Sequence, residues 1–277
     1  SEAMLLLRAF RDDVKAFRVH LPDLPPSVAE IRRLSRMGSS DAAAFARATA
    51  ASPALENYLI RAASNPLFSR ERACSDCADA VGRLGVQQAS ELALAFTPAL
   101  LRARCGADWD AGWLQSLAVA AAGWWLADST GLVSPHQAIV LGLLHNAGMP
   151  LAERYLAVQR ELALSGAAPR DVLPLLCRDI TRFLLLHWGV DDIYVQNLSP
   201  LYDWQQAGAS SRPGLCDLLQ SARYLQLLAD RDPGLPCPGT VAGLGRASLY
   251  QQGLLQPHAV WPAISEVVEN LQAVFDA

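Results

Sequence analysis

A histidine and an asparagine stand side by side at His145-Asn146, directly after the apolar run Ala138–Leu144 and shortly before Gly148. An imidazole can accept a proton, donate a hydrogen bond or bind a metal ion, and a carboxamide can both donate and accept. Because the preceding run is fully apolar, we expect the pair in a buried neighbourhood. From the residues alone we favour the simpler interpretation, in which His145 is a hydrogen-bonded core histidine and Asn146 caps the end of a helix.

Other catalytic patterns are missing from the sequence. It has no Gly-x-Ser-x-Gly, and Gly243-Leu244-Gly245 follows no predicted strand, so neither a serine hydrolase nor a dinucleotide-binding loop is expected. Of the six cysteines only Cys74 and Cys77 are close in sequence, which supplies half of a zinc site. We therefore expect reduced structural thiols and no cofactor. Trp204 is interpreted as a filler of the core or of an interface between lobes.

The composition excludes several classes of protein. Of 277 residues 52% are hydrophobic, and 23 basic against 27 acidic side chains give a net charge of -4. That apolar content can form a large core, which excludes intrinsic disorder. The mild acidity argues against a nucleic-acid partner. The uncharged segment 129–152 includes prolines and histidines, so it is not expected to cross a membrane. Together with the reduced thiols, this predicts a cytoplasmic location.

The elements that must position these residues are predicted to be helices. Apolar residues recur at spacings of three and four, and no stretch of strand length alternates, so the fold class is all-α. Single helices are expected around Leu92–Leu100, over Trp113–Trp125 and over Ile264–Phe275, the last after a loop over Asp232–Gly245. First-turn prolines and terminal glycines mark further helix ends at Pro26, Pro53, Pro135, Gly38, Gly85 and Gly131.

The charge distribution suggests two helical lobes, 1–107 and 108–277. Residues before Cys105 hold 14 basic and 11 acidic side chains, a net +3, and the remainder hold 9 and 16, a net -7. The stretch Arg104–Asp108 is the best candidate for the boundary. Because this linker is short, we expect the two lobes to share an apolar interface.

Seven short segments resemble, in their order and spacing, the signatures of the HDOD family, a bacterial signalling module related to HD-domain phosphohydrolases. They are Leu21–Pro26, Ser52–Leu55, Arg61–Phe68, Ala80–Gly85, Trp113–Ala120, Leu141–Gly148 and Leu184–Val190. The resemblance covers roughly residues 20–230. It implies a two-lobed, multi-helical HD-like architecture, in which 108–277 holds the HD-like helices and a C-terminal helical extension.

Active HD hydrolases hold divalent metals with histidines and aspartates, and the metals activate water. The resemblance places these positions at Gln115, His145, Asn146, Cys177, Ser199-Pro200 and Arg223. Only His145 keeps its type. Asn146 brings no negative charge, and Arg223 brings a cation that cannot be deprotonated. We therefore expect no metal and no enzyme activity, and we regard these positions as a degenerate metal pocket and a candidate ligand pocket.

The resemblance implies a non-catalytic output module of signal transduction that contacts other signalling proteins, as part of a longer response regulator. Two alternatives stay open: a metal-dependent HD-type phosphodiesterase acting on a cyclic nucleotide, and a sensor of a small anion or nucleotide that uses the former metal pocket. Arg32, Arg33 and Arg36 lie opposite the apolar stripe of their expected helix. They form the candidate partner surface, and a solvated helix face is the alternative.

Overall fold

The computed structural model describes residues 2–16, 18–39, 41–69, 73–105, 112–161, 169–208, 210–249 and 251–276. These residues form helices joined by turns and loops, with no strand among them, which confirms the all-α prediction. The helices are α1 (Glu2–Lys15), α2 (Pro26–Arg36), α3 (Ala42–Thr49), α4 (Pro53–Ala63), α5 (Cys77–Leu84), α6 (Val86–Ala95), α7 (Thr97–Cys105), α8 (Trp113–Thr130), α9 (Pro135–Leu144), α10 (Met149–Glu161), α11 (Pro169–His187), α12 (Asp192–Leu201), α13 (Leu215–Ala229), α14 (Ala242–Arg246) and α15 (Pro257–Gln272).

Prolines and glycines set helix ends where the sequence predicts them. The helices α2, α4 and α9 begin at Pro26, Pro53 and Pro135. Proline suits a first turn, because its missing N–H would have no partner inside the helix. Gly85 and Gly131 follow the ends of α5 and α8 with φ angles of 78° and 64°, a conformation that residues with a Cβ rarely adopt.

Two predictions about the elements are wrong. The helix expected around Leu92–Leu100 is two helices, α6 and α7, which meet at Phe96 because Pro98 has no N–H to continue the first helix. The loop expected over Asp232–Gly245 contains a short 3-10 turn, η2 (Pro238–Thr240), and most of α14. A Cβ on Gly243 would lie 2.4 Å from a backbone oxygen of α13, so glycine allows α14 to pack there.

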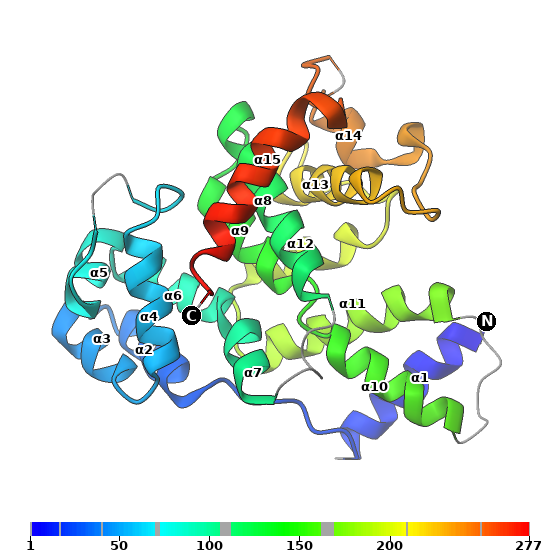
Figure 1. Ribbon diagram of the computed structural model, residues 1–277. Coiled ribbons are helices and arrows are strands. Elements are labelled where there is room, and N and C mark those ends of the chain that lie inside the picture. The colour runs from blue at the N-terminus through cyan, green and yellow to red at the C-terminus, as the bar shows by residue number, and fades with distance from the viewer. Residues whose placement is uncertain are drawn as a thin grey trace.

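The helices α8 and α9 cross at the centre of the molecule, with α13 and α15 beside them (Figure 1). Most of α8 is buried, as its lack of charge predicts, yet no helix in the described part of the chain is long and apolar enough to cross a membrane. A Cβ on Gly142 of α9 would lie 2.4 Å from the Ala120 Cα of α8. This close approach sets the spacing of the helices that carry Gln115 and His145.

The C-terminal segment ties the two sides of the chain together. The helix α15 begins at Pro257, earlier than expected. After it ends, the Phe275 ring packs edge-on against Tyr58, Phe96 and Trp113, with ring centroids 5.2, 5.2 and 4.9 Å apart. One continuous group of buried apolar side chains therefore includes residues from both expected lobes.

The first helix, α1, lies against α11, on the other side of the molecule from α2 to α5 (Figure 1). Phe10 packs edge-on against Tyr155, and Arg11 pairs with Asp179 at 2.7 Å. This helix belongs to 1–107 by sequence but packs on residues of 108–277. The boundary itself lies outside the described residues, so the division of the chain at that point stays a prediction.

Candidate functional site

The residues at the expected metal positions gather around one cavity of about 620 Å³. It lies among the start of α8, the turn after α9, the first turn of α10, the second turn of α11, the second half of α13 and the loops after α12 and α13. Its lining consists of Gln115, His145, Asn146, Met149, Leu173, Pro174, Tyr202, Trp204, Arg223, Gln226, Leu227, Asp232, Pro233 and Gly234. Four of the residues that the resemblance singles out, Gln115, His145, Asn146 and Arg223, thus face the same space.

The remaining expected positions lie behind this lining. Cys177 is fully buried, and its Sγ lies 3.8 Å from Asn146 Oδ1. Burial raises the pKa of this thiol, which keeps it protonated. Ser199 and Pro200 belong to the last turn of α12, and the Pro200 carbonyl accepts a hydrogen bond from Gln220. None of the three lines the cavity.

His145 is a buried, neutral imidazole. It is 1% exposed, and its Nδ1 lies 2.6 Å from the Gly142 carbonyl oxygen, so Nδ1 carries the hydrogen. Burial lowers the pKa of His145 to about 4, and the charge of Arg223 acts in the same direction. At pH 7 Nε2 therefore has a free lone pair that can accept a hydrogen bond.

Asn146 belongs to a hydrogen-bonded group with Tyr202 and Gln115. The Tyr202 hydroxyl lies 2.7 Å from both Asn146 Oδ1 and the His145 carbonyl oxygen, and its single hydrogen serves these two acceptors. Asn146 Nδ2 donates to Gln115 Oε1 at 3.5 Å. His145, not Asn146, is the residue that caps α9, so that part of the simpler interpretation is wrong.

Gly148 anchors the same turn to α11. A Cβ at this position would lie 2.5 Å from the Thr181 backbone nitrogen, and the Gly148 N–H donates to Thr181 Oγ1 at 2.9 Å. A larger residue would push the turn away from α11. Gly148 thus keeps His145 and Asn146 at the wall of the cavity.

Arg223 brings the positive charge of the cavity. Its guanidinium carbon lies 4.8 Å from the ring centroids of both Tyr202 and Trp204, and Nη1 donates to the Leu201 carbonyl at 3.1 Å. Burial lowers its pKa, but an arginine stays charged in proteins. Among the described residues no carboxylate forms an ion pair with it, and Asp232 is the acid that acts on its pKa through its charge.

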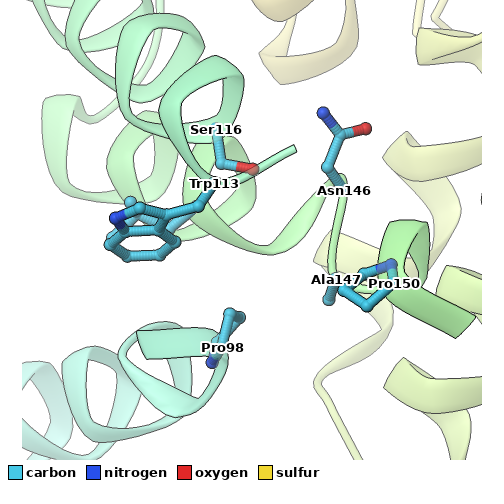
Figure 2. Close-up of a pocket in the computed structure, with 7 residues that line it drawn as sticks. Pro98, Trp113, Ser116, Asn146, Ala147 and Pro150 are labelled. Atoms are coloured by element: carbon cyan, nitrogen blue, oxygen red, sulfur yellow. The ribbon is translucent and has the colours of Figure 1, made fainter. Parts of the chain in front are cut away.

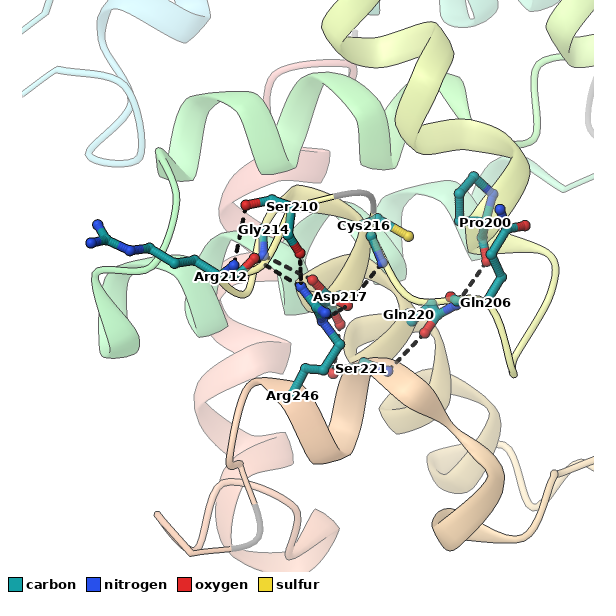
Figure 3. Close-up of polar contacts among 12 residues, drawn as sticks. Pro200, Gln206, Ser210, Arg212, Gly214, Cys216, Asp217, Gln220, Ser221 and Arg246 are labelled. Carbon is teal, nitrogen blue, oxygen red and sulfur yellow. Dashed lines mark hydrogen bonds and ion pairs between the residues drawn. The ribbon is translucent and has the colours of Figure 1, made fainter.

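Tyr202, which no sequence pattern singled out, and Trp204, which was expected to be a filler, both line the cavity. Their loop is held by α13: the Gln220 carboxamide donates to the carbonyls of Pro200, Asp203 and Gln206 at 2.7–2.9 Å. Figure 3 shows Gln220 beside Pro200 and Gln206. Only the aromatic pair two residues apart, just after a helix, could have pointed to this role.

The same loop is fixed at its far end by a buried carboxylate. Asp217 is completely buried, accepts hydrogen bonds from the backbone N–H groups of Gly208 and Gly214, and pairs with Arg246 at 2.9 Å (Figure 3). Arg246 also donates to the carbonyls of Ser210 and Arg212. Helices α13 and α14 therefore fix the loop that carries the two aromatic residues.

A second cavity lies near Asn146 but is too small for an organic ligand. Its volume is about 10 Å³, roughly the space of one water molecule, and its lining includes Pro98, Trp113, Ser116 and Asn146. In Figure 2 the carboxamide of Asn146 points away from the side chains of Pro98 and Trp113. The polar end of Asn146 thus belongs to the larger cavity.

The three arginines of α2 do not share one exposed face. Arg32 is 5% exposed, donates to the Gly189 carbonyl at 2.7 Å and lies 3.6 Å from Asp191. The prediction that Arg32 lies opposite the core is therefore wrong, because this side chain bridges α2 to the turn after α11. Arg33 and Arg36 are exposed, and Arg36 also donates to the Gly189 carbonyl.

The donors around the larger cavity do not fit a divalent metal of the HD type. Among the described residues no three His, Cys, Asp or Glu side chains lie close enough together to hold one. The expected positions present the amides of Gln115 and Asn146, the protonated thiol of Cys177 and the cation of Arg223. His145 alone offers an imidazole nitrogen. Hard divalent ions prefer anionic oxygens, which are missing from this set.

Comparisons with known proteins agree with this fold. A family model described as the HDOD domain matches residues 21–202. A candidate metal-dependent phosphohydrolase from Shewanella amazonensis has a similar structure, with a TM-score of 0.76 and 16% identity over 99% of both chains. An HDOD domain protein of unknown function from Geobacter sulfurreducens is also similar in structure, with a TM-score of 0.68 and 18% identity over 99% of this chain and 98% of the other. A search of curated proteins gave no match.

Proposed function

The chain belongs to the HDOD domain family, and we propose that it is a non-catalytic signalling module that acts in the cytoplasm through contacts with other proteins. In this role it is the output part of a longer response regulator. The proposal has two separate parts. One concerns the cavity, which lacks the means to hydrolyse a phosphoester. The other concerns the surface that a partner would use.

The chemistry of the cavity carries the first part. Arg223 brings a permanent positive charge to a position where the HD pattern has an acidic metal ligand. Two unit positive charges ~4 Å apart repel by ~4 kcal/mol at an effective dielectric constant of ~20, and a divalent ion is repelled by about twice as much. The neutral His145 and two amides cannot offset this repulsion. Without a bound metal, no group in the cavity generates hydroxide at neutral pH.

A metal-dependent phosphodiesterase is the alternative, since one protein of similar fold is named a candidate metal-dependent phosphohydrolase. Elemental analysis after growth with added manganese, iron and nickel, together with assays on cyclic dinucleotides, separates the two. We expect substoichiometric metal and no turnover. Stoichiometric metal, with turnover that a chelator abolishes and metal restores, would refute the proposal.

A double variant, Asn146→Asp with Arg223→Asp, tests the same reasoning from the other side. It removes the cation and adds two carboxylates at the lining of the cavity. It should bind manganese more tightly than the wild type, whereas Arg33→Asp on the surface should not. Equal metal affinity in the wild type and the double variant would show that the charge of Arg223 is not what excludes metal.

A groove beside α2 is where we expect a partner to bind. It encloses about 320 Å³ and is lined by Leu24, Ala29, Arg32, Arg33, Arg36, Met37 and Trp188. Met37 is 70% exposed and the Arg33 side chain 53% exposed. Arginine and methionine are both enriched at protein interfaces, and a cation beside an apolar group suits an acidic partner surface with an apolar centre.

Charge reversal tests this surface. Arg33→Glu should reduce the capture of partner proteins from a bacterial lysate and impair signalling in the full-length regulator. Arg33 pairs with Glu30 at 2.7 Å. Arg47→Glu on α3 is the matched control, because the Arg47 side chain is also exposed, 71%, and pairs with Asp41 at 3.5 Å. Both variants should melt close to the wild type. Equal capture by the two variants would contradict the assignment. Arg32 is unsuitable for this test because it is buried.

A further inference from the structure

The larger cavity has the size and the lining of a small-molecule site. Its volume of about 620 Å³ falls in the range of pockets that enclose organic ligands, roughly 300–1,000 Å³. The lining has two chemical parts. Gln115, His145 and Arg223 offer hydrogen-bonding groups, whereas Leu173, Pro174, Met149, Leu227 and Pro233 form an apolar wall. A ligand that fits both parts has a polar group joined to a larger, weakly polar body.

The bonds of Arg223 indicate the charge of that polar group. A guanidinium has five N–H groups, and one of them bonds to the Leu201 carbonyl. The rings of Tyr202 and Trp204 each lie 4.8 Å from its central carbon, and its other N–H groups point outward in the plane of the guanidinium. Arg223 is half-buried, and a charge partly withdrawn from water without a counter-ion is unfavourable, so a bound anion would supply the missing charge.

The one acidic residue of the lining does not replace such an anion. Asp232 is exposed, and its Oδ1 accepts a hydrogen bond from the Gly234 N–H at 2.6 Å. It acts on Arg223 through its charge without forming an ion pair. A planar guanidinium pairs its N–H donors with the oxygens of either a carboxylate or a phosphate, and of the two a phosphate monoester carries the larger negative charge at pH 7.

We propose that this cavity binds a nucleoside monophosphate, with the phosphate paired to the edge of Arg223 and the base against the apolar wall of Leu173, Pro174 and Leu227. The inference rests on the proposed function in one respect, namely that no metal occupies the cavity. Nε2 of His145 accepts a hydrogen bond from a ribose hydroxyl or a base N–H. Gln115, at the exposed side of the lining, supplies a further amide.

Calorimetric titration in a chelating buffer tests the proposal. The probes are AMP, GMP, CMP and UMP. The four nucleosides and inorganic phosphate serve as controls, because each represents one part of a monophosphate. At least one monophosphate should bind the wild type. The corresponding nucleoside should bind at least about 10-fold more weakly, because it lacks the strong hydrogen bonds between the phosphate and the charged Arg223. Arg223→Gln should weaken the binding of the monophosphate by a similar factor, and the surface variant Arg47→Gln should leave that binding unchanged.

A second variant keeps the test decisive if Arg223→Gln does not fold. Asp232→Asn removes the opposing charge at an exposed position and retains an oxygen for the Gly234 N–H. It should tighten monophosphate binding severalfold. The proposal is overturned if no monophosphate binds the wild type, if Arg223→Gln binds as tightly as the wild type, or if Asp232→Asn weakens binding.

Failure of this inference differs in its result from failure of the proposed function. If the chain is a metal enzyme, monophosphate binding appears only when manganese is added, and cyclic dinucleotides are hydrolysed. If only the ligand is wrong, no monophosphate binds with or without manganese, and no turnover is seen.

Discussion

Two glycines, Gly142 in α9 and Gly82 in α5, provide a matched test of the packing that positions the cavity. Each lies two residues before the end of its helix, and neither has a positive φ. A Cβ on Gly82 would meet nothing within 4 Å, whereas a Cβ on Gly142 would lie 2.4 Å from the Ala120 Cα and 2.8 Å from its Cβ. The same substitution to alanine therefore has opposite expected effects.

The magnitudes follow from two opposing terms. Alanine is favoured over glycine within a helix by ~1 kcal/mol, so Gly82→Ala should stabilise by ~0.5–1 kcal/mol. At Gly142 the new methyl must push α8 and α9 apart by roughly 1 Å, and such overpacking costs about 3 kcal/mol when backbone must move. The net loss for Gly142→Ala is then ~2 kcal/mol, or ~4 °C in melting temperature.

Thermal unfolding followed by circular dichroism, with urea titration for the free energy of unfolding, measures both variants. Gly82→Ala should melt ~1–2 °C above the wild type and Gly142→Ala below it. If Gly142→Ala were as stable as the wild type, α8 and α9 could not meet as closely as described. The spacing between Gln115 and Asn146 would then have no structural basis.

Three further predictions concern buried polar groups. The folded-state pKa of His145 is about 4 and its ordinary value 6.5, so the unfolded chain takes up a proton in this window and the folded chain does not. Stability should fall by ~2 kcal/mol more between pH 7 and pH 5 in the wild type than in His145→Gln, as urea titration would show, and parallel pH profiles would contradict it. Gln220→Leu leaves several carbonyls without their donor and should lower the free energy of unfolding, measured by urea titration, by at least ~3 kcal/mol. The exposed control Gln87→Leu should lower it much less, and equal losses in the two variants would contradict this prediction. Arg32→Ala should lower the free energy of unfolding by ~2–3 kcal/mol, because it removes the hydrogen bond to Gly189 and the packing of the buried methylene groups. The melting temperature of Arg33→Ala should stay that of the wild type, and a reversed order would refute the burial of Arg32.

The helical class and many helix ends follow from the sequence alone. Pro26, Pro53 and Pro135 mark starts and Gly85 marks an end, because these residues act on the backbone within a single turn. The resemblance also identified the region that matters, since four of its positions line the cavity. Asn146 and Arg223 could be judged unsuited to a metal without a structure, because charge is a property of the residue alone.

The surroundings of these residues were decided by the tertiary structure. Arg32 is buried because the turn at Gly189 lies over α2, and Trp204 lines the cavity because Gln220, on another helix, holds its loop. The contact between Arg32 and Gly189 joins residues far apart in the chain. The contact between Gln220 and Asp203 spans a loop, and no periodicity in the sequence predicts the path of that loop. Burial, stacking on Arg223 and the lowered pKa of His145 all depend on which distant groups exclude water from a side chain, and spacing along the sequence does not contain that information.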